Sequence, residues 1–506
     1  MMTANTKAFA VSLSFLAEGL ADILPAGDME ITGLSSDTRT IAKGDLFIAY
    51  ETSSYSNIQY INEAVRAGAC AILADSRSLP ENYLCPVPVI LIPELFKFVG
   101  IIGSRFYGHP SRQVNITGIT GTNGKTSVSH ILARAMSDCN GIHTGLIGTI
   151  GTGLYPDLQP GVNTTPDALS LQGLFANMYS RGVKHIALEV SSHGIDQYRI
   201  SGTRFKVAVF TNLSRDHLDY HRTMENYAKS KEQLFTEFDV EKAVINLDDD
   251  AGVRIIGKIG DDIPVTGYTL DDQKHHLYIE SGDCVFGRIT RQSLQGMSIL
   301  VETPWGGGEI HTSLFGEYNA SNILAACAVL GLHGFDFHKI TETLSGTYGI
   351  PGRMESFGNR NTCRIIIDYA HTPAALEKVL KTLRPLCNAR LICVFGCGGN
   401  RDRGKRPDMA KIAEQYADLV TLTNDNPRNE DPEQIIDEIR SGFTYGNRVS
   451  VIPDREQAIR DAISAANRDD VILVAGKGHE EYQEISGIRI PFSDRNIVIS
   501  SLEGSI

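Results

Sequence analysis

The feature that most constrains the fold is a glycine-rich turn between an apolar, β-branched run and a helical pattern. This stretch runs from Asn115 to Ser127 as NITGITGTNGKTS, and helical periodicity continues over residues 128–136. The order strand, glycine loop, helix predicts a phosphate loop, because loop amides and the positive end of the helix dipole face one anion. The spacing is not the usual one, since Ile119 stands where the first glycine is expected. The Gly-Lys-Thr ending favours a nucleotide site over a plain strand–helix turn.

Composition excludes several classes of protein. At roughly 150 residues per domain, the 506 residues suggest about three domains. The formal charge of −13 argues against nonspecific nucleic-acid binding, and no apolar run approaches the ~18 residues of a membrane span. The nine scattered cysteines favour a reducing, cytoplasmic compartment, and Cys393 and Cys397 are interpreted as core thiols. We expect small-molecule substrates, no membrane or nucleic-acid partner, and a monomer. The apolar residues 8–16 are interpreted as part of an amphipathic helix reaching Leu24, not as a signal peptide.

The hydrophobic patterns predict an α/β protein with three domains. Residues 1–108 form a smaller α/β domain, residues 109–345 a central phosphate-loop domain with a parallel sheet, and residues 346–506 a doubly wound, Rossmann-like domain. A β insertion is expected between His276 and Thr312, where short alternating runs are broken by glycines. Strands are predicted at 45–49, 71–74, 87–92, 186–190, 207–210, 243–246, 364–369, 391–395, 419–422, 448–451 and 471–474.

Polar clusters follow two predicted strands of the central domain. Glu189-Val-Ser-Ser-His193 comes after one strand, and residues 212–221, including His217, come after the next. Open α/β sheets bind ligands at this edge, so the Thr126 hydroxyl, the Glu189 carboxylate and the His217 imidazole are predicted around Mg²⁺. Alternatively, Glu189 caps a helix and His217 is a hydrogen-bonded loop histidine. No signature of covalent catalysis is present, and the clusters suit phosphoryl transfer, in which Lys125 reaches the terminal phosphates.

Seven short motifs occur in the order found in the Mur ligases, and the chain resembles that family over nearly its whole length. The likeness is to members that add the third amino acid. It implies an ATP-dependent ligase that joins meso-2,6-diaminopimelate to the D-Glu of UDP-N-acetylmuramoyl-L-alanyl-D-glutamate in peptidoglycan synthesis, with ATP and Mg²⁺. The motifs are Gly121-Thr-Asn-Gly-Lys-Thr126, Asn163-Thr-Thr-Pro166, Glu189-Val-Ser-Ser-His193, Asp216-His-Leu-Asp219, Gly352-Arg353, Asp368-Tyr-Ala-His371 and Asp425-Asn-Pro-Arg428.

Three alternatives stay open. The first is the same ligation with L-lysine. The second is a folylpolyglutamate-synthase-like ligase, which shares the phosphate loop but is not expected to carry Asn163-Thr-Thr-Pro166 or Asp425-Asn-Pro-Arg428. The third is a nucleotide-gated binding protein that keeps the fold and performs no ligation.

The resemblance also implies a role for individual residues. Lys125, Lys231 and His217 would be catalytic, and Thr126, Glu189, His217 and a carbamylated Lys231 would bind the metal. ATP would contact Gly121, Thr122, Asn123, Gly124, Lys125, Thr126, Ser127, Asn319 and Arg353. The muramoyl nucleotide would contact Ser36, Thr38, Asn163, Thr164, Thr165, Ser191, Gln197 and Arg199. The diamino acid would contact Arg401, Asp425, Asn426, Pro427, Arg428, Gly476 and Glu480.

Three positions carry an alternative role or depart from the family pattern. Lys231 lies three residues before Leu-Phe, where the family carries a carbamylated lysine; alternatively, it is a solvated helix lysine like Lys229. Arg428 offers a planar fork suited to the distal carboxylate of diaminopimelate, which lysine lacks; alternatively, it caps a turn after Pro427. Residues 51–56 replace the glycine and Asp-Gly-His/Arg turn that the family often has, so uridine contacts are not carried over there.

Overall fold

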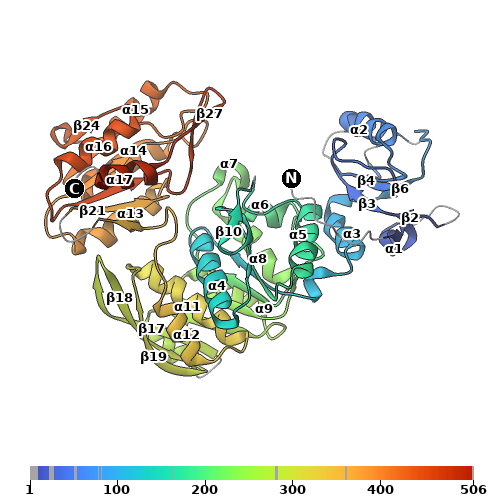
Figure 1. Ribbon diagram of the computed structural model, residues 1–506, viewed down its shortest axis with the longest axis horizontal. Coiled ribbons are helices and arrows are strands. Elements are labelled where there is room, and N and C mark those ends of the chain that lie inside the picture. The colour runs from blue at the N-terminus through green and yellow to red at the C-terminus, as the bar shows by residue number, and fades with distance from the viewer. Residues whose placement is uncertain are drawn as a thin grey trace. The chain divides into compact units, whose positions relative to one another are not determined.

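The computed structural model describes most of the chain, which divides into two compact units. The first comprises Met1–Leu213, Glu225–Val285 and Ala325–Ile340, and the second comprises Ser214–Met224, Phe286–Leu324 and Thr341–Ile506. Figure 1 colours the chain by residue number. Of the unusual segment 51–56, residues 51–53 lie outside the described residues and the rest begins a helix, and the expected helix end at Leu24 also lies outside them. The described ranges are 10–21, 28–50, 54–77, 79–80, 83–161, 163–279, 283–358 and 362–503.

The first unit begins with a four-stranded parallel sheet of order β3-β4-β5-β6 (blue in Figure 1). Alternate residues of β4 enter different cores, with Leu46 on one face and Phe47 on the other. This confirms the predicted small α/β fold. The elements are β3 (Gly33–Ser35), β4 (Asp45–Ala49), α2 (Ser54–Ala67), β5 (Ala71–Asp75), β6 (Val89–Ile92) and α3 (Val99–Phe106).

The expected long N-terminal helix is wrong in extent. Strand β1 (Val11–Ser12) pairs with β2 (Glu30–Ile31), and helix α1 spans only Leu13–Ala17. The Ser12 side chain accepts a hydrogen bond from the Phe15 backbone N–H, which fixes the start of the helix.

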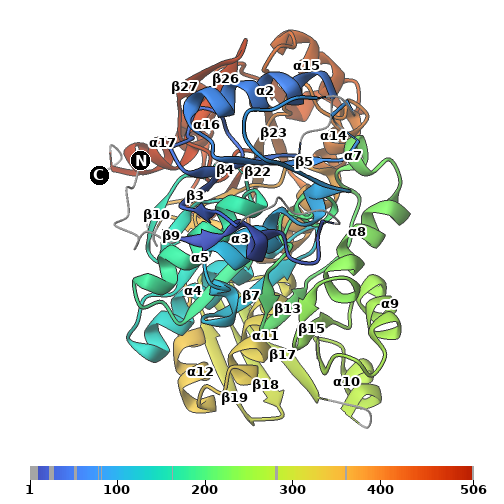
Figure 2. The same cartoon turned by 90° about the vertical axis from the view of Figure 1, so that its right-hand side faces the viewer.

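The central sheet of the first unit places β7 between β11 and β13, all parallel. Figure 2 labels β7 and its neighbour β13. Because these neighbours end at the same edge, the phosphate loop after β7 lies beside the residues that follow both of them. The strands are β7 (Asn115–Thr120), β8 (Gly145–Ile147), β9 (Thr152–Leu154), β10 (Asp157–Gln159), β11 (His185–Glu189), β13 (Val207–Phe210), β15 (Ala243–Asn246) and β16 (Val265–Thr269). The main helices are α4 (Lys125–Asn140), α5 (Ala168–Ser180), α8 (Met224–Thr236) and α9 (Asp250–Ile259).

The predicted β insertion is confirmed, but its strands begin later than His276. Helix α10 occupies Asp272–Ile279, and three antiparallel strands follow: β17 (Asp283–Ser293), β18 (Gly296–Thr303) and β19 (Gly306–Thr312). Helices α11 (Glu317–Leu332) and α12 (Phe337–Ser345) come next.

The second unit contains a six-stranded sheet of order β20-β21-β25-β22-β23-β24, in which only β20 is antiparallel to its neighbour. Helices α13, α14 and α15 cover one face, while α16 and α17 cover the other, so the predicted doubly wound fold is confirmed (Figure 1). The strands are β20 (Glu355–Phe357), β21 (Arg364–Asp368), β22 (Leu391–Phe395), β23 (Leu419–Leu422), β24 (Val449–Val451) and β25 (Val471–Ala475). The helices are α13 (Pro373–Leu383), α14 (Lys405–Tyr416), α15 (Pro432–Arg440), α16 (Arg455–Ala465) and α17 (Asp494–Glu503).

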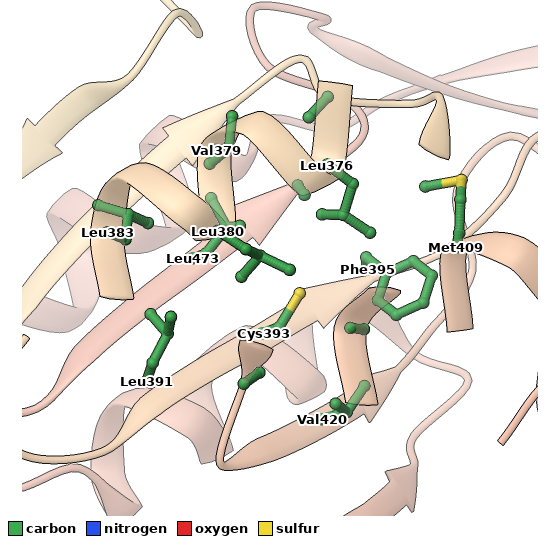
Figure 3. Packing of buried hydrophobic residues seen from close by; sticks show 14 of the residues in the cluster. Leu376, Val379, Leu380, Leu383, Leu391, Cys393, Phe395, Met409, Val420 and Leu473 are labelled. Atoms are coloured by element: carbon green, nitrogen blue, oxygen red, sulfur yellow. The ribbon is translucent and has the colours of Figure 1, made fainter. Parts of the chain in front are cut away.

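Figure 3 shows the core beneath α13 and α14, where Leu380 lies near Cys393 and Met409 lies near Phe395. Cys393 lies within this core and Cys397 contacts the Met409 sulfur at 3.6 Å. Burial raises the pKa of both thiols to about 12, so they remain protonated and inert. Their interpretation as core thiols is confirmed.

Candidate active site

The phosphate loop joins β7, which ends at Thr120, to α4, which begins at Lys125. Gly121 has φ of +144°, and a Cβ atom there would lie 1.9 Å from the Thr211 hydroxyl. No other residue fits this backbone, which explains the glycine. Gly124 precedes the helix with φ of +88°. The loop amides and the first turn of α4 therefore face the C-terminal edge of the sheet, as a phosphate site requires.

Two lysines converge on one carbonyl of this loop. Lys125 Nζ donates to the carbonyls of Gly121 and Thr122 at 2.7 and 2.9 Å. Lys231 Nζ, from α8, donates to the same Gly121 oxygen at 2.9 Å and lies 4.4 Å from the centroid of the Tyr227 ring. Lys231 is only 1% exposed, whereas Lys229 is exposed. The interpretation of Lys231 as a solvated helix lysine is therefore wrong.

Glu189 is fully buried at the end of β11, level with Ile119 of the phosphate-loop strand. Its Oε2 accepts from Thr126 Oγ1 at 3.0 Å and from Thr149 Oγ1 at 2.9 Å, and its Oε1 accepts from the Thr149 N–H at 3.0 Å. Glu189 does not cap the next helix, because the Ser191 side chain does so by accepting from the Gly194 N–H. The structure thus places the Glu189 carboxylate and the Thr126 hydroxyl together.

The residues expected to hold the muramoyl dipeptide form a connected network around Glu189. Thr164 Oγ1 lies 3.0 Å from Thr149 Oγ1, and Thr165 Oγ1 donates to the Glu189 carbonyl at 2.8 Å. Arg199 Nη1 donates to the Thr165 carbonyl at 2.8 Å. The remaining candidates lie nearby or face solvent: Ser191 is hydrogen-bonded to Thr165, Gln197 to Arg199, and Asn163 is exposed.

Asn212 clamps the phosphate loop from the end of β13. Its Oδ1 accepts from the Asn123 N–H at 3.1 Å, and its Nδ2 donates to the Asn123 carbonyl at 3.0 Å. Its own carbonyl accepts from the Thr122 N–H at 2.8 Å. Asn212 was visible in the sequence only as the first residue of the second polar cluster.

A separate cavity of about 600 Å³ lies in the N-terminal domain. Ser36 and Thr38 line it, and Thr38 Oγ1 donates to Glu63 Oε2 at 3.3 Å. Hydrogen bonds from Arg39 lower the pKa of Asp37 to about 2, so this wall carries a fixed carboxylate. The two residues expected at the uridine end thus share a cavity.

Three predicted residues belong to the second unit and are described within it. His217 has φ of +52° and its Nε2 lies 3.6 Å from Asp216 Oδ2. Asn319 is buried and donates through Nδ2 to the Phe315 carbonyl at 2.9 Å. The Arg353 guanidinium lies 4.5 Å from the Tyr369 ring centroid. The joint metal set of Thr126, Glu189, His217 and Lys231 stays a prediction.

The Asp425–Arg428 loop follows β23 and meets the segment that follows β25. Asn426 Nδ2 donates to Glu480 Oε2 at 2.8 Å, and Lys477 Nζ donates to the same Glu480 oxygen at 2.9 Å. Gly476 has φ of +114°, and a Cβ there would lie 2.7 Å from Asp425 Oδ2. The structure therefore brings Asp425, Asn426, Gly476 and Glu480 together.

Arg428 is held by a short hairpin of β26 (Tyr482–Ile485) and β27 (Ile488–Pro491). Its backbone N–H donates to the Glu484 carbonyl at 2.9 Å, and its Nε lies 3.6 Å from Glu484 Oε2. Its Nη1 donates to the Gly399 carbonyl at 2.8 Å, so the guanidinium reaches a neighbouring loop rather than capping its own turn. Arg401 lies on that neighbouring loop and is exposed.

Comparison with known proteins decides the family. Residues 119–330 match the Mur ligase middle domain, and residues 352–478 match the Mur ligase glutamate ligase domain. The chain is 46% identical over 467 residues to a UDP-N-acetylmuramoyl-L-alanyl-D-glutamate--2,6-diaminopimelate ligase of Coxiella burnetii, covering 92% of this chain and 94% of that one. The chain belongs to the Mur ligase family.

Two further Mur ligases are similar to this chain over nearly its whole length. A ligase of the same name from Pseudomonas aeruginosa is 45% identical over 468 residues, covering 92% of this chain and 94% of the relative. A solved structure with that name superposes with a TM-score of 0.71 at 33% identity, covering 98% of this chain and 99% of the other.

Four residues that sequence reasoning did not single out contact candidate residues or their loops within their own unit. They are Thr149 and Asn212 in the first unit and Lys477 and Arg406 in the second. Arg406 is fully buried and donates to Glu430 and Glu438, and to the Gly398 carbonyl. Their polar character was visible, but their partners lie far away in sequence. Among the described residues, no helix has the length and apolarity that a membrane crossing needs. Within the same ranges, no group of three or more histidine, cysteine, aspartate or glutamate residues is arranged to hold a metal.

Proposed function

We propose that this Mur ligase joins meso-2,6-diaminopimelate to the D-Glu of UDP-N-acetylmuramoyl-L-alanyl-D-glutamate, with conversion of ATP to ADP and phosphate. The observation that carries the proposal is the near-full-length identity of 46% and 45% to two ligases named for this acceptor and this amino acid. A cytoplasmic location, a monomeric form and a division into domains at residues 108 and 345 belong to the same proposal.

ATP would bind on residues 121–127, with Asn319 and Arg353 as further contacts. The left-handed Gly121 and the helix that begins at Lys125 support this, because they leave backbone amides for phosphate oxygens. Thr126 Oγ1 and Glu189 Oε2, 3.0 Å apart, are oxygen donors of the kind that Mg²⁺ prefers. Together with His217 and a carbamylated Lys231, they would hold Mg²⁺, which supplies charge neutralisation for the phosphates when bound.

The reaction would proceed in two displacements. The D-Glu γ-carboxylate oxygen attacks the γ-phosphorus of ATP, and the bond from that phosphorus to the β-phosphate oxygen breaks. ADP departs, and an acyl phosphate forms on the D-Glu. The neutral amine of the diamino acid then attacks the acyl carbon, loses a proton, and expels phosphate. Lys125 would neutralise the transferring phosphoryl group, while Asn212 holds the loop in place through Asn123.

Substrate positions follow from the two other clusters. The cavity beside Ser36 and Thr38 would take the uridine end. The muramoyl dipeptide would lie on Asn163, Thr164, Thr165, Ser191, Gln197 and Arg199, five of which share one hydrogen-bonded network. Arg428 and Arg401 would bind carboxylates of diaminopimelate, and Glu480 would accept from its distal ammonium. L-Lysine offers no distal carboxylate, so this arrangement favours diaminopimelate.

The test measures phosphate release and product mass. Release should require ATP, the muramoyl dipeptide nucleotide and meso-diaminopimelate together, and mass spectrometry should find the nucleotide tripeptide. Reactions lacking each component in turn are the controls. Phosphate release that ignores the acceptor would instead indicate a nucleotide-gated protein, and product formation with a folate and glutamate would indicate a folylpolyglutamate-type ligase. Either result would overturn the proposal.

A further inference from the structure

Lys477 is a fully buried cation between two residues expected to bind the diamino acid. Its side chain is 0% exposed, and its Nζ donates to Asn426 Oδ1 and to Glu480 Oε2, each at 2.9 Å. The Nζ also lies 5.7 Å from the centroid of the Tyr482 ring. A buried lysine is costly unless it is paired, so its position indicates a specific task rather than a solvated surface charge.

The hydrogen bonds of Lys477 fix the orientation of the Asn426 amide. Asn426 Oδ1 accepts both from Lys477 Nζ and from the Glu484 N–H at 3.0 Å. Two donors at this atom require it to be the oxygen, so Nδ2 must point the other way, toward Glu480 Oε2 at 2.8 Å. Lys477 and the β26 hairpin therefore set the face that Asn426 presents.

The same contacts divide the two oxygens of Glu480 between protein and ligand. Oε2 accepts from Lys477 and Asn426, whereas Oε1 receives no donor from the described residues. The Glu480 side chain is 17% exposed, so it remains reachable from solvent. A carboxylate held by one oxygen presents the other in a defined direction to an ammonium group.

The backbone on each side of Lys477 holds it in this direction. Gly476 and Gly478 both have positive φ, +114° and +55°. A Cβ at Gly478 would lie 2.8 Å from Tyr369 Cβ. The lysine thus sits on a backbone segment with little room to rearrange.

We infer that Lys477 is a positioning residue of the amino-acid subsite, which orients Asn426 and Glu480 so that Glu480 Oε1 meets the distal ammonium of the diamino acid. This inference rests on the proposed function. Lys477 does not touch the substrate in this arrangement. It acts on Glu480 directly and through the Asn426 amide, which donates to the same Glu480 oxygen.

The experiment compares Lys477→Met, Glu480→Gln and the double variant in the full-length enzyme. Lys477→Met keeps the length of the side chain and removes its charge. The control is Arg390→Met, which breaks the ion pair of Arg390 with the buried Asp470 at the opposite end of the same sheet. Steady-state KM is measured for meso-diaminopimelate, for ATP and for the nucleotide acceptor, with Tm recorded for each variant.

The KM for diaminopimelate should rise about tenfold or more in Lys477→Met, as expected when a charge-assisted contact is lost, while the other two KM values stay within about twofold. Arg390→Met should leave all three within about twofold. The double variant should resemble Glu480→Gln, because Lys477 acts through Glu480. An unchanged KM for diaminopimelate, or a parallel rise of all three values, would overturn the inference.

If Lys477→Met does not fold, the double variant takes its place in the test. It removes both the lysine and the glutamate charge, so no buried charge is left unpaired. If the double variant matches Glu480→Gln in its KM for diaminopimelate, the inference stands; a further tenfold rise would refute it. Wild-type enzyme without diaminopimelate-dependent phosphate release would instead contradict the proposed function itself, so the two failures are distinguishable.

Discussion

Replacing Arg428 with alanine should abolish the preference for meso-diaminopimelate over L-lysine. Arg428 is held in place through its main chain by the hairpin at Glu484 and through Nη1 by the Gly399 carbonyl. A guanidinium has five N–H donors. Among the described residues, one of the Arg428 donors makes a hydrogen bond, from Nη1 to the Gly399 carbonyl. Nε faces Glu484 Oε2 at 3.6 Å, which leaves the other Nη1 and Nη2 donors as a fork suited to a carboxylate. Diaminopimelate carries such a carboxylate at its distal end and lysine does not.

The magnitude follows from the contact that is lost. The Arg428 side chain is 19% exposed, so a carboxylate bound there would be largely removed from water. Leaving a partly buried carboxylate without its partner costs on the order of 3–5 kcal/mol, which corresponds to at least about a hundredfold in kcat/KM. Lysine loses no such contact in the variant. The wild-type preference should therefore exceed about a hundredfold, and Arg428→Ala should reduce it to a few-fold at most.

The assay is kcat/KM for both amino acids at saturating ATP and nucleotide acceptor. Arg460→Ala is the matched control, because Arg460 is 40% exposed and pairs with Glu456 one helical turn away in α16. That control should keep the wild-type preference. A folded Arg428→Ala enzyme that still discriminates a hundredfold would refute the assignment of Arg428 to the distal carboxylate. Equal use of L-lysine by the wild type would refute the choice of diaminopimelate and leave the ligase proposal standing.

Three further predictions concern the central domain. Lys125→Ala should keep its circular dichroism spectrum and lose about a hundredfold or more in turnover, because a positioned charge on the phosphoryl group is gone; near-wild-type turnover would contradict this. Lys231→Ala should lose activity and regain part of it with a small added carboxylate, as expected if Lys231 acts as a carbamate; full activity without the additive would remove the idea. Burial lowers the pKa of His185 to about 4 and that of His333 to about 3, both below the unfolded value of 6.5. Their contribution to stability is complete above pH 6.5 and is lost as pH falls toward those values, by at most about 1.4 kcal/mol per pH unit for each. The free energy of unfolding, measured with urea, should fall between pH 6.5 and 5 by this contribution. The double variant His185→Phe/His333→Gln should lack this contribution.

The sequence alone determined the local features of the site. The apolar run, the glycines and the helix start of residues 115–127 specify a phosphate loop, because each is a short-range preference of the backbone. Glu189 was placed at the correct edge of the sheet, since parallel strands end on the same side and Glu189 ends one. The doubly wound C-terminal domain followed from strand and helix patterns in the same way.

Tertiary structure alone decided which side chains meet. Lys229 and Lys231 are equivalent in the sequence, but two residues on a helix point about 200° apart, so one faces solvent and the other reaches the Gly121 carbonyl, 110 residues away. The sequence did not single out Lys477. Its role appears only from the sheet order, in which β25 lies beside β22 and residues 476–480 meet the Asp425–Arg428 loop. Hydrophobic periodicity predicts that a strand is buried, but it does not predict which strand lies next to it. The contacts made at strand ends therefore appear only once the chain is folded.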